Sequence, residues 1–329
     1  MLNNHVLSLV GDTPLVQLTP KHLGYIDLYA KLEYFNPNGS VKDRAAKYII
    51  DKLLHTGEIS SNTLIIESSS GNFGISLAAY CKFNNLKFHC VIDPLISPIN
   101  ELLIRSQGAE VTKVTERDAN GGYLLNRIQK IEELRQVTAD SYWINQYQNP
   151  YNAEAYYHSL GEELNKQCER IDYIFIGVSS GGTITGLSQS VKKNFPHCKV
   201  IAVDIDGSVL FGGTPKKRFI PGIGSSLVPP ILEQAYIDEV VVVNEYDTVM
   251  HCRELLKNQY IFAGGSSGSI MAAITSYFAK QTFSVPPAVV GIFCDRGDRY
   301  ATTIYDDRWV EEVFEQHILS GGDKHALSR

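Results

Sequence analysis

The sequence predicts an α/β protein with two lobes, each built on a mostly parallel twisted sheet flanked by helices. Strand-like apolar runs alternate with helix-periodic segments along most of the 329 residues, as in parallel sheets covered by helices. Nine such runs are more than one sheet usually holds, so we expect two sheets. The composition changes near "NQYQNPYN" at residues 145–152, and we place a domain boundary there.

The chain is therefore expected to divide into three parts. Residues 1–36 and 148–315 would form a large domain, residues 37–147 a small mobile domain, and the polar, aperiodic residues 316–329 a flexible tail. The predicted strands are residues 27–34, 63–67, 87–93, 109–114, 142–146, 172–178, 199–205, 239–243 and 288–294.

Composition excludes several classes of partner. Thirty Lys and Arg against 36 Asp and Glu give a net charge of -6, and the longest basic run is "KKR" at 216–218, so we expect no nucleic-acid binding. No stretch resembles a signal peptide or a membrane span, which predicts a cytoplasmic protein. The six cysteines are widely spaced without a C-x-x-C pair, so we expect reduced, buried thiols and no metal site.

Three strand-to-helix junctions rich in serine and glycine are candidate ligand sites. In open α/β sheets, ligands bind at the carboxyl ends of strands, where the free N–H groups of the next helix can hold anions. "SSSGN" at 68–72 suits a carboxylate, and "SSGGT" at 179–183 suits a phosphate; "GGSSG" at 264–268 opens a third helix. Helix capping explains any one of them alone, but three together favour ligand binding. Since nucleotide-binding glycine patterns are missing, we expect a phosphate-bearing cofactor.

A lysine at the start of a predicted helix points to the same kind of cofactor. In "NPNGSVKDR" at 36–44, Ser40 or Asn38 can cap the helix, which places Lys42 in its first turn. The helix dipole disfavours an ammonium there, and a neutral amine is what a Schiff-base lysine requires. The alternative is a surface lysine that pairs with Asp43 or Glu33. The lysine and the phosphate loop together suggest pyridoxal phosphate.

These motifs resemble those of the fold-type II pyridoxal-phosphate enzymes, the cysteine synthase and cystathionine β-synthase family, over nearly the whole chain. "GDTPLVQL" at 11–18 is similar to the family's opening strand, "NPNGSVKDR" to its lysine motif, and "SSSGN" to its substrate-carboxylate loop. "SSGGTITG" is similar to its phosphate loop, and "AGGSSGS" to the segment that faces the pyridine nitrogen. The resemblance implies a tryptophan synthase β-like fold whose large domain binds the cofactor.

The resemblance also implies roles for individual residues. Lys42 would hold the cofactor and remove the substrate α-proton, Asn72 would donate to the cofactor's phenolic oxygen, and Ser266 would meet the pyridine nitrogen. A serine at that nitrogen limits the electron sink, which suits β-elimination over transamination. The remaining implied residues would hold the cofactor phosphate (Ser179, Ser180, Gly181, Gly182 and Thr183) or the substrate carboxylate (Ser69, Ser70 and Gln146).

Other stretches resemble a narrower group, the N-(2-amino-2-carboxyethyl)-L-glutamate synthases that make 2,3-diaminopropionate precursors for siderophores and peptide antibiotics. They include residues 93–111, 117–134, 145–152, 206–226 and 294–300. This likeness implies O-phospho-L-serine as donor, L-glutamate as nucleophile, and a homodimer. Such anionic substrates need cations and hydrogen-bond donors, and Arg127, Arg218 and Tyr147 are the candidates. Their alternatives are a solvated helix face, a solvated loop and a core tyrosine; "DRGDRY" at 295–300 has no assigned role.

Three rival functions remain open at this point. A cysteine synthase that uses sulfide with O-acetylserine or O-phosphoserine would share every cofactor residue and differ only in the pocket. A serine or threonine dehydratase would release a keto acid without an acceptor. A cofactor-bearing scaffold that binds amino acids or a peptide tail would not need Lys42, so the presence of that lysine argues against it.

Overall fold

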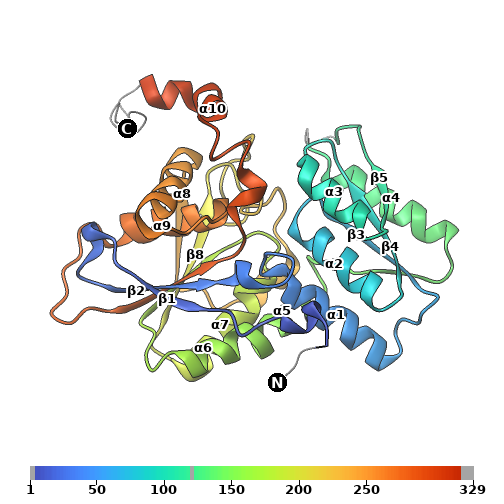
Figure 1. The fold of residues 1–329 in the computed structure, drawn as a ribbon, viewed down its shortest axis with the longest axis horizontal. Helices are drawn as coiled ribbons and strands as arrows, with labels where there is room; N and C mark the ends of the chain where they lie inside the picture. Colours follow the sequence, from blue (N-terminus) through green and yellow to red (C-terminus); the bar gives the residue numbers. More distant parts are fainter. Residues whose placement is uncertain (1–3, 119–121, 320–329) are drawn as a thin grey trace.

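The computed structural model describes residues 4–118 and 122–319, and these form two sheets with helices on both faces (Figure 1). The larger sheet has six strands in the order β1-β2-β10-β7-β8-β9. All neighbours are parallel except β1 and β2. The strands are β1 (Leu15–Leu18), β2 (Asp27–Leu32), β7 (Tyr173–Gly177), β8 (Lys199–Ile205), β9 (Glu239–Val243) and β10 (Ala288–Phe293).

The smaller sheet has four parallel strands in the order β5-β4-β3-β6. They are β3 (Leu64–Ser68), β4 (Lys87–Ile92), β5 (Glu110–Lys113) and β6 (Ser141–Trp143). All four lie inside the segment 37–147 that was expected to form the small domain. Figure 1 shows this sheet with α2, α3 and α4 on the right-hand side of the molecule, and the six-stranded sheet with α8 and α9 on the left.

Ten α-helices and several short helical turns connect the strands of the described residues. The α-helices are α1 (Lys42–Thr56), α2 (Asn72–Phe83), α3 (Pro98–Ser106), α4 (Leu124–Val137), α5 (Pro150–Tyr156), α6 (Glu162–Gln167), α7 (Gly182–Asn194), α8 (Glu245–Gln259), α9 (Gly265–Phe278) and α10 (Asp307–Leu319). A π-helical turn, η4 (Tyr157–Gly161), joins α5 to α6, and 3-10 turns form η1 (Val6–Leu9), η2 (Lys21–Leu23), η3 (Glu33–Phe35), η5 (Pro230–Gln234) and η6 (Gly297–Tyr300). Across 4–118 and 122–319, no helix combines the length and the apolar character needed to cross a bilayer.

The central strand β10 shows why its sequence is apolar at nearly every position. Its side chains alternate between two cores: Val290 and Ile292 pack into the cluster on the face of α5 and α7, while Val289 and Phe293 pack under α9. A strand buried on both faces needs apolar residues on both. The first of these cores continues through α1 and α2 to the smaller sheet, so the two sheets share one hydrophobic core.

The structure confirms the predicted α/β class, the two sheets and all nine strands. The opening segment adds a tenth strand, β1, and it is the antiparallel one. Helix α10 continues to Leu319, past residue 316 where the tail was expected to begin, and residues 320–329 lie outside the described part. Neither Ser40 nor Asn38 caps α1 as expected. Val41 is its N-cap, and the Ser40 hydroxyl instead accepts from the Lys42 N–H at 3.3 Å.

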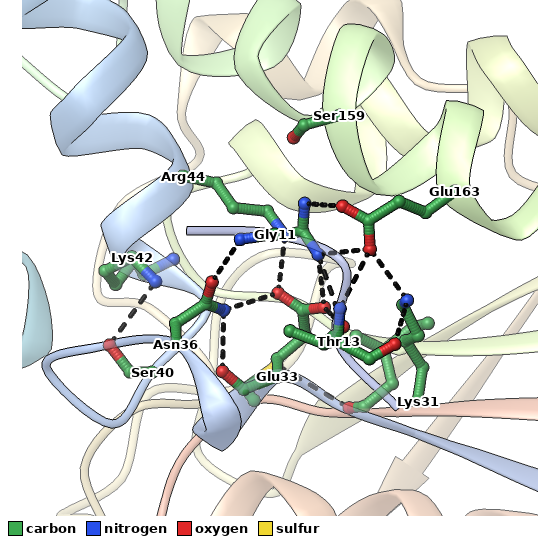
Figure 2. Close-up of polar contacts among 12 residues, drawn as sticks. Gly11, Thr13, Lys31, Glu33, Asn36, Ser40, Lys42, Arg44, Ser159 and Glu163 are labelled. Carbon is green, nitrogen blue, oxygen red and sulfur yellow. Dashed lines mark hydrogen bonds and ion pairs between the residues drawn. The ribbon is translucent and has the colours of Figure 1, made fainter. Parts of the chain in front are cut away.

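A buried ionic cluster fixes the start of α1 against the large sheet (Figure 2). The Arg44 guanidinium donates to both carboxylate oxygens of Glu33, at 2.6 and 2.8 Å, and to both of Glu163, at 2.6 and 2.8 Å. Lys31 Nζ donates to Glu163 at 2.8 Å. The side chains of Arg44, Glu33 and Lys31 are 0% exposed. Two acids and two bases thus neutralise one another, with only Glu163 partly exposed, at 12%, and they join η3, β2, α1 and α6.

Because its charges are buried, this cluster should be sensitive to the loss of one member. We expect Arg44→Ala to lower the free energy of unfolding by about 3–5 kcal/mol, since it leaves the Glu33 carboxylate buried and unpaired. The matched control is Lys47→Ala on the same helix, because Lys47 pairs with Asp51 at the surface and exposed pairs contribute about 0–1 kcal/mol. Urea unfolding of both variants measures the difference. Equal losses of unfolding free energy in the two variants would show that the buried cluster contributes no more to stability than a surface ion pair.

The same cluster predicts acid sensitivity. Burial raises the pKa of Glu163, but the hydrogen bonds and charges of Arg44 and Lys31 outweigh it and lower the pKa to about 2. An unfolded glutamate titrates near pH 4.3, so between about pH 5 and pH 2 the unfolded chain binds the extra proton and stability falls as the pH falls. We expect Glu163→Gln to be less stable than wild type at pH 7 and to show a shallower loss of stability over this window. If stability fell equally steeply with pH in wild type and in Glu163→Gln, the lowered pKa of Glu163 would be contradicted.

Candidate active site

A pocket of about 570 Å³ lies where the two sheets present the carboxyl ends of their strands. Its wall includes residues that follow β3, β4, β7 and β10, together with the first turns of α1, α2, α7 and α9. The site residues predicted from the sequence that line it are Lys42, Ser69, Ser70, Asn72, Arg127, Gln146, Tyr147, Ser179, Ser180, Gly181, Thr183 and Ser266. Gly182 and Arg218 are not on the wall.

Lys42 is the first residue of α1, and its amine faces this pocket rather than a carboxylate. Its Nζ lies 5.9 Å from the centre of the Tyr156 ring. The two expected surface partners are used elsewhere: Asp43 accepts from the Asn38 side chain at 2.7 Å, and Glu33 binds Arg44. Within the described residues no ion pair is formed by Lys42. The lysine therefore has no structural partner that would compete with a ligand.

The start of α7 forms an anion cradle. Gly181 has φ +87°, a conformation that side-chain-bearing residues rarely adopt, so glycine is required at this turn. A Cβ on Gly182 would lie 2.4 Å from the side chain of Asn152, so the helix start approaches α5 too closely for any other residue. This explains Gly182, which is off the pocket wall. Ser180 and Thr183 are buried and line the pocket beside the free N–H groups of the helix.

Ser266 and Cys294 lie on the same wall as Lys42. Ser266 is in the first turn of α9 and is 4% exposed. Cys294 follows β10. Burial raises the pKa of its thiol to about 12, and the positive charge of Lys42 opposes this shift. A thiol with such a pKa stays protonated at neutral pH, so Cys294 is a packing residue and not a nucleophile.

The two serines of the β3–α2 loop already have hydrogen bonds. The Ser69 hydroxyl accepts from the Gly74 N–H at 3.0 Å, which is the capping role considered above. The Ser70 hydroxyl donates to Asp93 at 3.0 Å and accepts from Arg127 at 3.1 Å. Both residues line the pocket, so a bound carboxylate would meet backbone N–H groups of this loop beside hydroxyls of fixed orientation.

The expected substrate cations differ in their positions. Arg127, on α4, donates from Nη1 to Ser70 and lies 3.0 Å from Asp93, and its buried Nε has no partner among the residues that the structure describes. Tyr147, which follows Gln146, also lines the pocket. Burial raises the pKa of Tyr147, and the charges of Arg127 and Arg218 oppose that shift. Arg218 itself donates to Ser226 at 3.1 Å and to the Ile223 carbonyl at 3.4 Å.

Comparison with known proteins decides which family these residues serve. Residues 6–295 match the family model described as "Pyridoxal-phosphate dependent enzyme". The chain belongs to this family. The pocket fits the cofactor, because an amine without an ion-pair partner among the described residues, a helix start with glycine at positive φ and a buried serine hydroxyl share one wall.

Three solved structures place this pyridoxal-phosphate enzyme among its relatives. It is 33% identical to an O-acetylserine-dependent cystathionine β-synthase from Helicobacter pylori, with 93% of this chain and 100% of that one covered and a TM-score of 0.86. It is 30% identical to a hydrogen sulfide-producing enzyme from Fusobacterium nucleatum, with 91% and 100% covered and a TM-score of 0.84. It is 27% identical to O-ureido-L-serine synthase, with 98% and 100% covered and a TM-score of 0.85.

Sequence reasoning missed several polar residues of the pyridoxal-phosphate enzyme's pocket. Asp93 follows β4, and Asp295 follows β10; Arg299 and Tyr300 belong to the "DRGDRY" stretch. None of these four residues belongs to a junction rich in serine and glycine. A single acidic residue directly after a buried strand is an equally good signal in a parallel sheet, and it would have found both aspartates.

A buried carboxyl lies behind the substrate loop of this pyridoxal-phosphate enzyme. Glu67 accepts from the Ser68 N–H at 2.8 Å and from the Gln146 N–H at 3.4 Å, and it is 1% exposed. Burial raises its pKa to about 7, and the hydrogen bonds from the backbone only partly offset this. The carboxyl therefore joins the ends of β3 and β6 while it titrates in the physiological range.

This raised pKa predicts an inverse pH dependence. Between about pH 4.5 and pH 7 the folded state keeps the Glu67 proton that the unfolded state has lost, so this group makes stability fall as the pH rises. We expect unfolding measurements from pH 5 to pH 8 to show that wild type loses stability relative to Glu67→Gln. The control is Glu58→Gln, an exposed acid, which should run parallel to wild type. A constant difference between wild type and Glu67→Gln would contradict the expectation.

Proposed function

We propose that this enzyme joins O-phospho-L-serine and L-glutamate by β-replacement, giving N-(2-amino-2-carboxyethyl)-L-glutamate, a 2,3-diaminopropionate precursor, and releasing phosphate. One observation carries the proposal. Two arginines on the pocket wall keep buried N–H groups that find no partner among residues 4–118 and 122–319: Nε of Arg127, and Nε and Nη1 of Arg299. Buried polar groups are normally paired, so unpaired donors in a pocket favour a ligand that completes them.

The number of unpaired donors favours large anionic substrates. O-Phospho-L-serine brings a carboxylate and a dianionic phosphate, and L-glutamate brings two more carboxylates. Guanidinium groups bind both kinds of anion in bidentate geometry. Sulfide is a single small anion and needs almost no pocket. A volume of about 570 Å³ lined by two arginines therefore suits the amino-acid nucleophile better.

The residues at the lobe junction would divide the chemistry between them. Bound pyridoxal phosphate supplies the electron sink that makes the α-proton of an amino acid acidic. The Lys42 amine would hold the cofactor and then carry that proton. Asn72 would donate to the phenolic oxygen, and Ser266 would meet the pyridine nitrogen. The cradle at the start of α7, residues 179–183, would hold the cofactor phosphate through its N–H groups and hydroxyls.

The substrate groups would lie on the small-sheet side. Ser69, Ser70 and Gln146 would bind the donor's carboxylate. Arg127 is held by Asp93 and Ser70, so its orientation is set before any substrate arrives, and with Tyr147 it would receive the leaving phosphate or a glutamate carboxylate. Closure of the small domain would then exclude water, which otherwise would attack in place of the amine.

A second candidate uses sulfur. The Helicobacter pylori relative is described as O-acetylserine-dependent and the Fusobacterium nucleatum relative as hydrogen sulfide-producing, so a cysteine synthase that takes sulfide with O-acetylserine or O-phosphoserine shares the same fold and cofactor site. This candidate leaves the unpaired N–H groups of the two arginines without a function.

Nucleophile competition separates the two candidates. Purified enzyme receives O-phospho-L-serine with equal concentrations of L-glutamate and sulfide, and mass spectrometry identifies the products. We expect the glutamate adduct as the main product. Cysteine as the main product would reject the proposal in favour of the sulfur reaction, and pyruvate alone would indicate an elimination enzyme. Replacing O-phospho-L-serine by O-acetyl-L-serine in the same assay identifies the preferred leaving group.

The role of Arg127 has a direct test. We expect Arg127→Met to lower kcat/KM for the glutamate reaction roughly tenfold to hundredfold, the equivalent of one or two charge-assisted hydrogen bonds. Arg135→Met is the matched control, because Arg135 lies on the same helix and pairs with Glu132 at the surface. Steady-state kinetics with each substrate varied in turn show which one the arginine binds. Equal kinetics of the two variants would make Arg127 a structural residue.

A further inference from the structure

Asp295 lies where three parts of the pocket meet. It follows β10 and begins the "DRGDRY" stretch. Its carbonyl accepts from the Gly264 N–H at 2.9 Å, just before α9. Ser40, in the loop just before Lys42, forms an isolated antiparallel β-bridge with Asp295. The backbone at this position therefore holds both the segment just before Lys42 and the segment just before Ser266. The side chain is 2% exposed.

The carboxylate of Asp295 uses only one of its oxygens. Oδ2 accepts from Asn72 Nδ2 at 2.8 Å and from the Tyr300 hydroxyl at 2.8 Å. Oδ1 is buried and has no partner in the described part of the chain, and a Cβ on Gly264 would lie 2.0 Å from it. Leaving one oxygen of a buried carboxylate unpaired is unfavourable. An aspartate that served only to tie the loop together would be expected to use both oxygens, so the contact with Asn72 needs another explanation.

The contact determines which way the Asn72 amide faces. An asparagine amide has a donor end and an acceptor end that are nearly equal in shape, and its hydrogen-bond partners decide the orientation. A carboxylate accepts only from the NH₂ end. The second hydrogen of Nδ2 finds no acceptor within 4–118 or 122–319, and Asn72 lines the pocket. The amide is therefore held with one donor bound and one left for a ligand.

We propose that Asp295, held in place by Tyr300, is a positioning residue that orients the Asn72 amide so that it donates to the cofactor. The inference rests on the proposed contact of Asn72 with the phenolic oxygen. It gives a function to the "DRGDRY" stretch: Asp295 acts through Asn72, and the Tyr300 hydroxyl keeps the carboxylate from rotating. It is independent of which nucleophile the enzyme uses.

Cofactor reconstitution tests the proposal. Apoenzyme variants are titrated with pyridoxal phosphate, and the dissociation constant and the visible absorption spectrum of the holoenzyme are recorded. We expect Asp295→Ala to bind the cofactor roughly tenfold more weakly, the worth of one hydrogen bond to a charged group, with a changed ratio of the visible to the near-ultraviolet band. Asp295→Asn keeps an acceptor oxygen for Asn72 and should recover most of the affinity. Asp298→Asn, an exposed change in the same stretch, should match wild type.

A double-mutant cycle shows whether Asp295 acts through Asn72. We expect Asn72→Ala and Asp295→Ala to lose similar affinity, and the double variant to lose no more than either. Additive losses, or an Asp295→Asn variant as weak as Asp295→Ala, would overturn the proposal and leave the cofactor role of Asn72 standing. Wild-type affinity in Asn72→Ala would instead remove that role, and the proposal with it. Circular dichroism of each variant shows whether it is folded. Tyr300→Phe removes only the hydroxyl that holds Asp295, so we expect it to weaken cofactor binding less than Asp295→Ala.

Discussion

The buried ionic cluster around Arg44 is the constraint on which the rest of the site depends. Arg44 is two residues from Lys42 in the first turn of α1, and its guanidinium is held by Glu33 and Glu163 from the large-sheet side. A helix held this tightly at its first turn cannot rotate, so the lysine amine keeps its direction into the pocket. Burial of four charges is costly and stays tolerable only because each is paired. The main role of the cluster is therefore to fix the position of Lys42, and its contribution to stability is secondary.

The fold could be predicted because its signals are local. Continuous apolar runs mark strands that are buried on both faces, and their alternation with helices allows few arrangements other than parallel sheets. The serine- and glycine-rich loops could be found for the same reason, since Gly181 is required by the local backbone geometry; the need for Gly182 comes from a distant contact with Asn152. β1 has only four residues, and two of them are exposed, so its own pattern was too weak and the family likeness was needed to find it.

The polar support behind the loops could not be predicted, because it depends on contacts between distant segments. Asn72 and Asp295 are 223 residues apart, and Arg127 and Ser70 are 57 apart. A sequence read locally shows Asp295 as one acid in a charged stretch. Only the packing of β10 beside the lysine loop brings it to the start of α2. The direction of a side chain depends on its partners, and here those partners are distant in the sequence; for Asn72 the partner comes from the other sheet.

Two buried carboxyls accept hydrogen bonds from groups at the edge of the pocket. Glu67 stands behind the Ser68 and Gln146 N–H groups, and Asp295 stands behind Asn72. Burial raises the pKa of both carboxyls, so neither is a strong fixed charge at every pH. The Ser68 and Gln146 N–H groups are used by Glu67, so that carboxyl fixes the backbone of the loop and the strand end. The Asn72 amide has two hydrogens, so the contact with Asp295 orients it and leaves one hydrogen for a ligand.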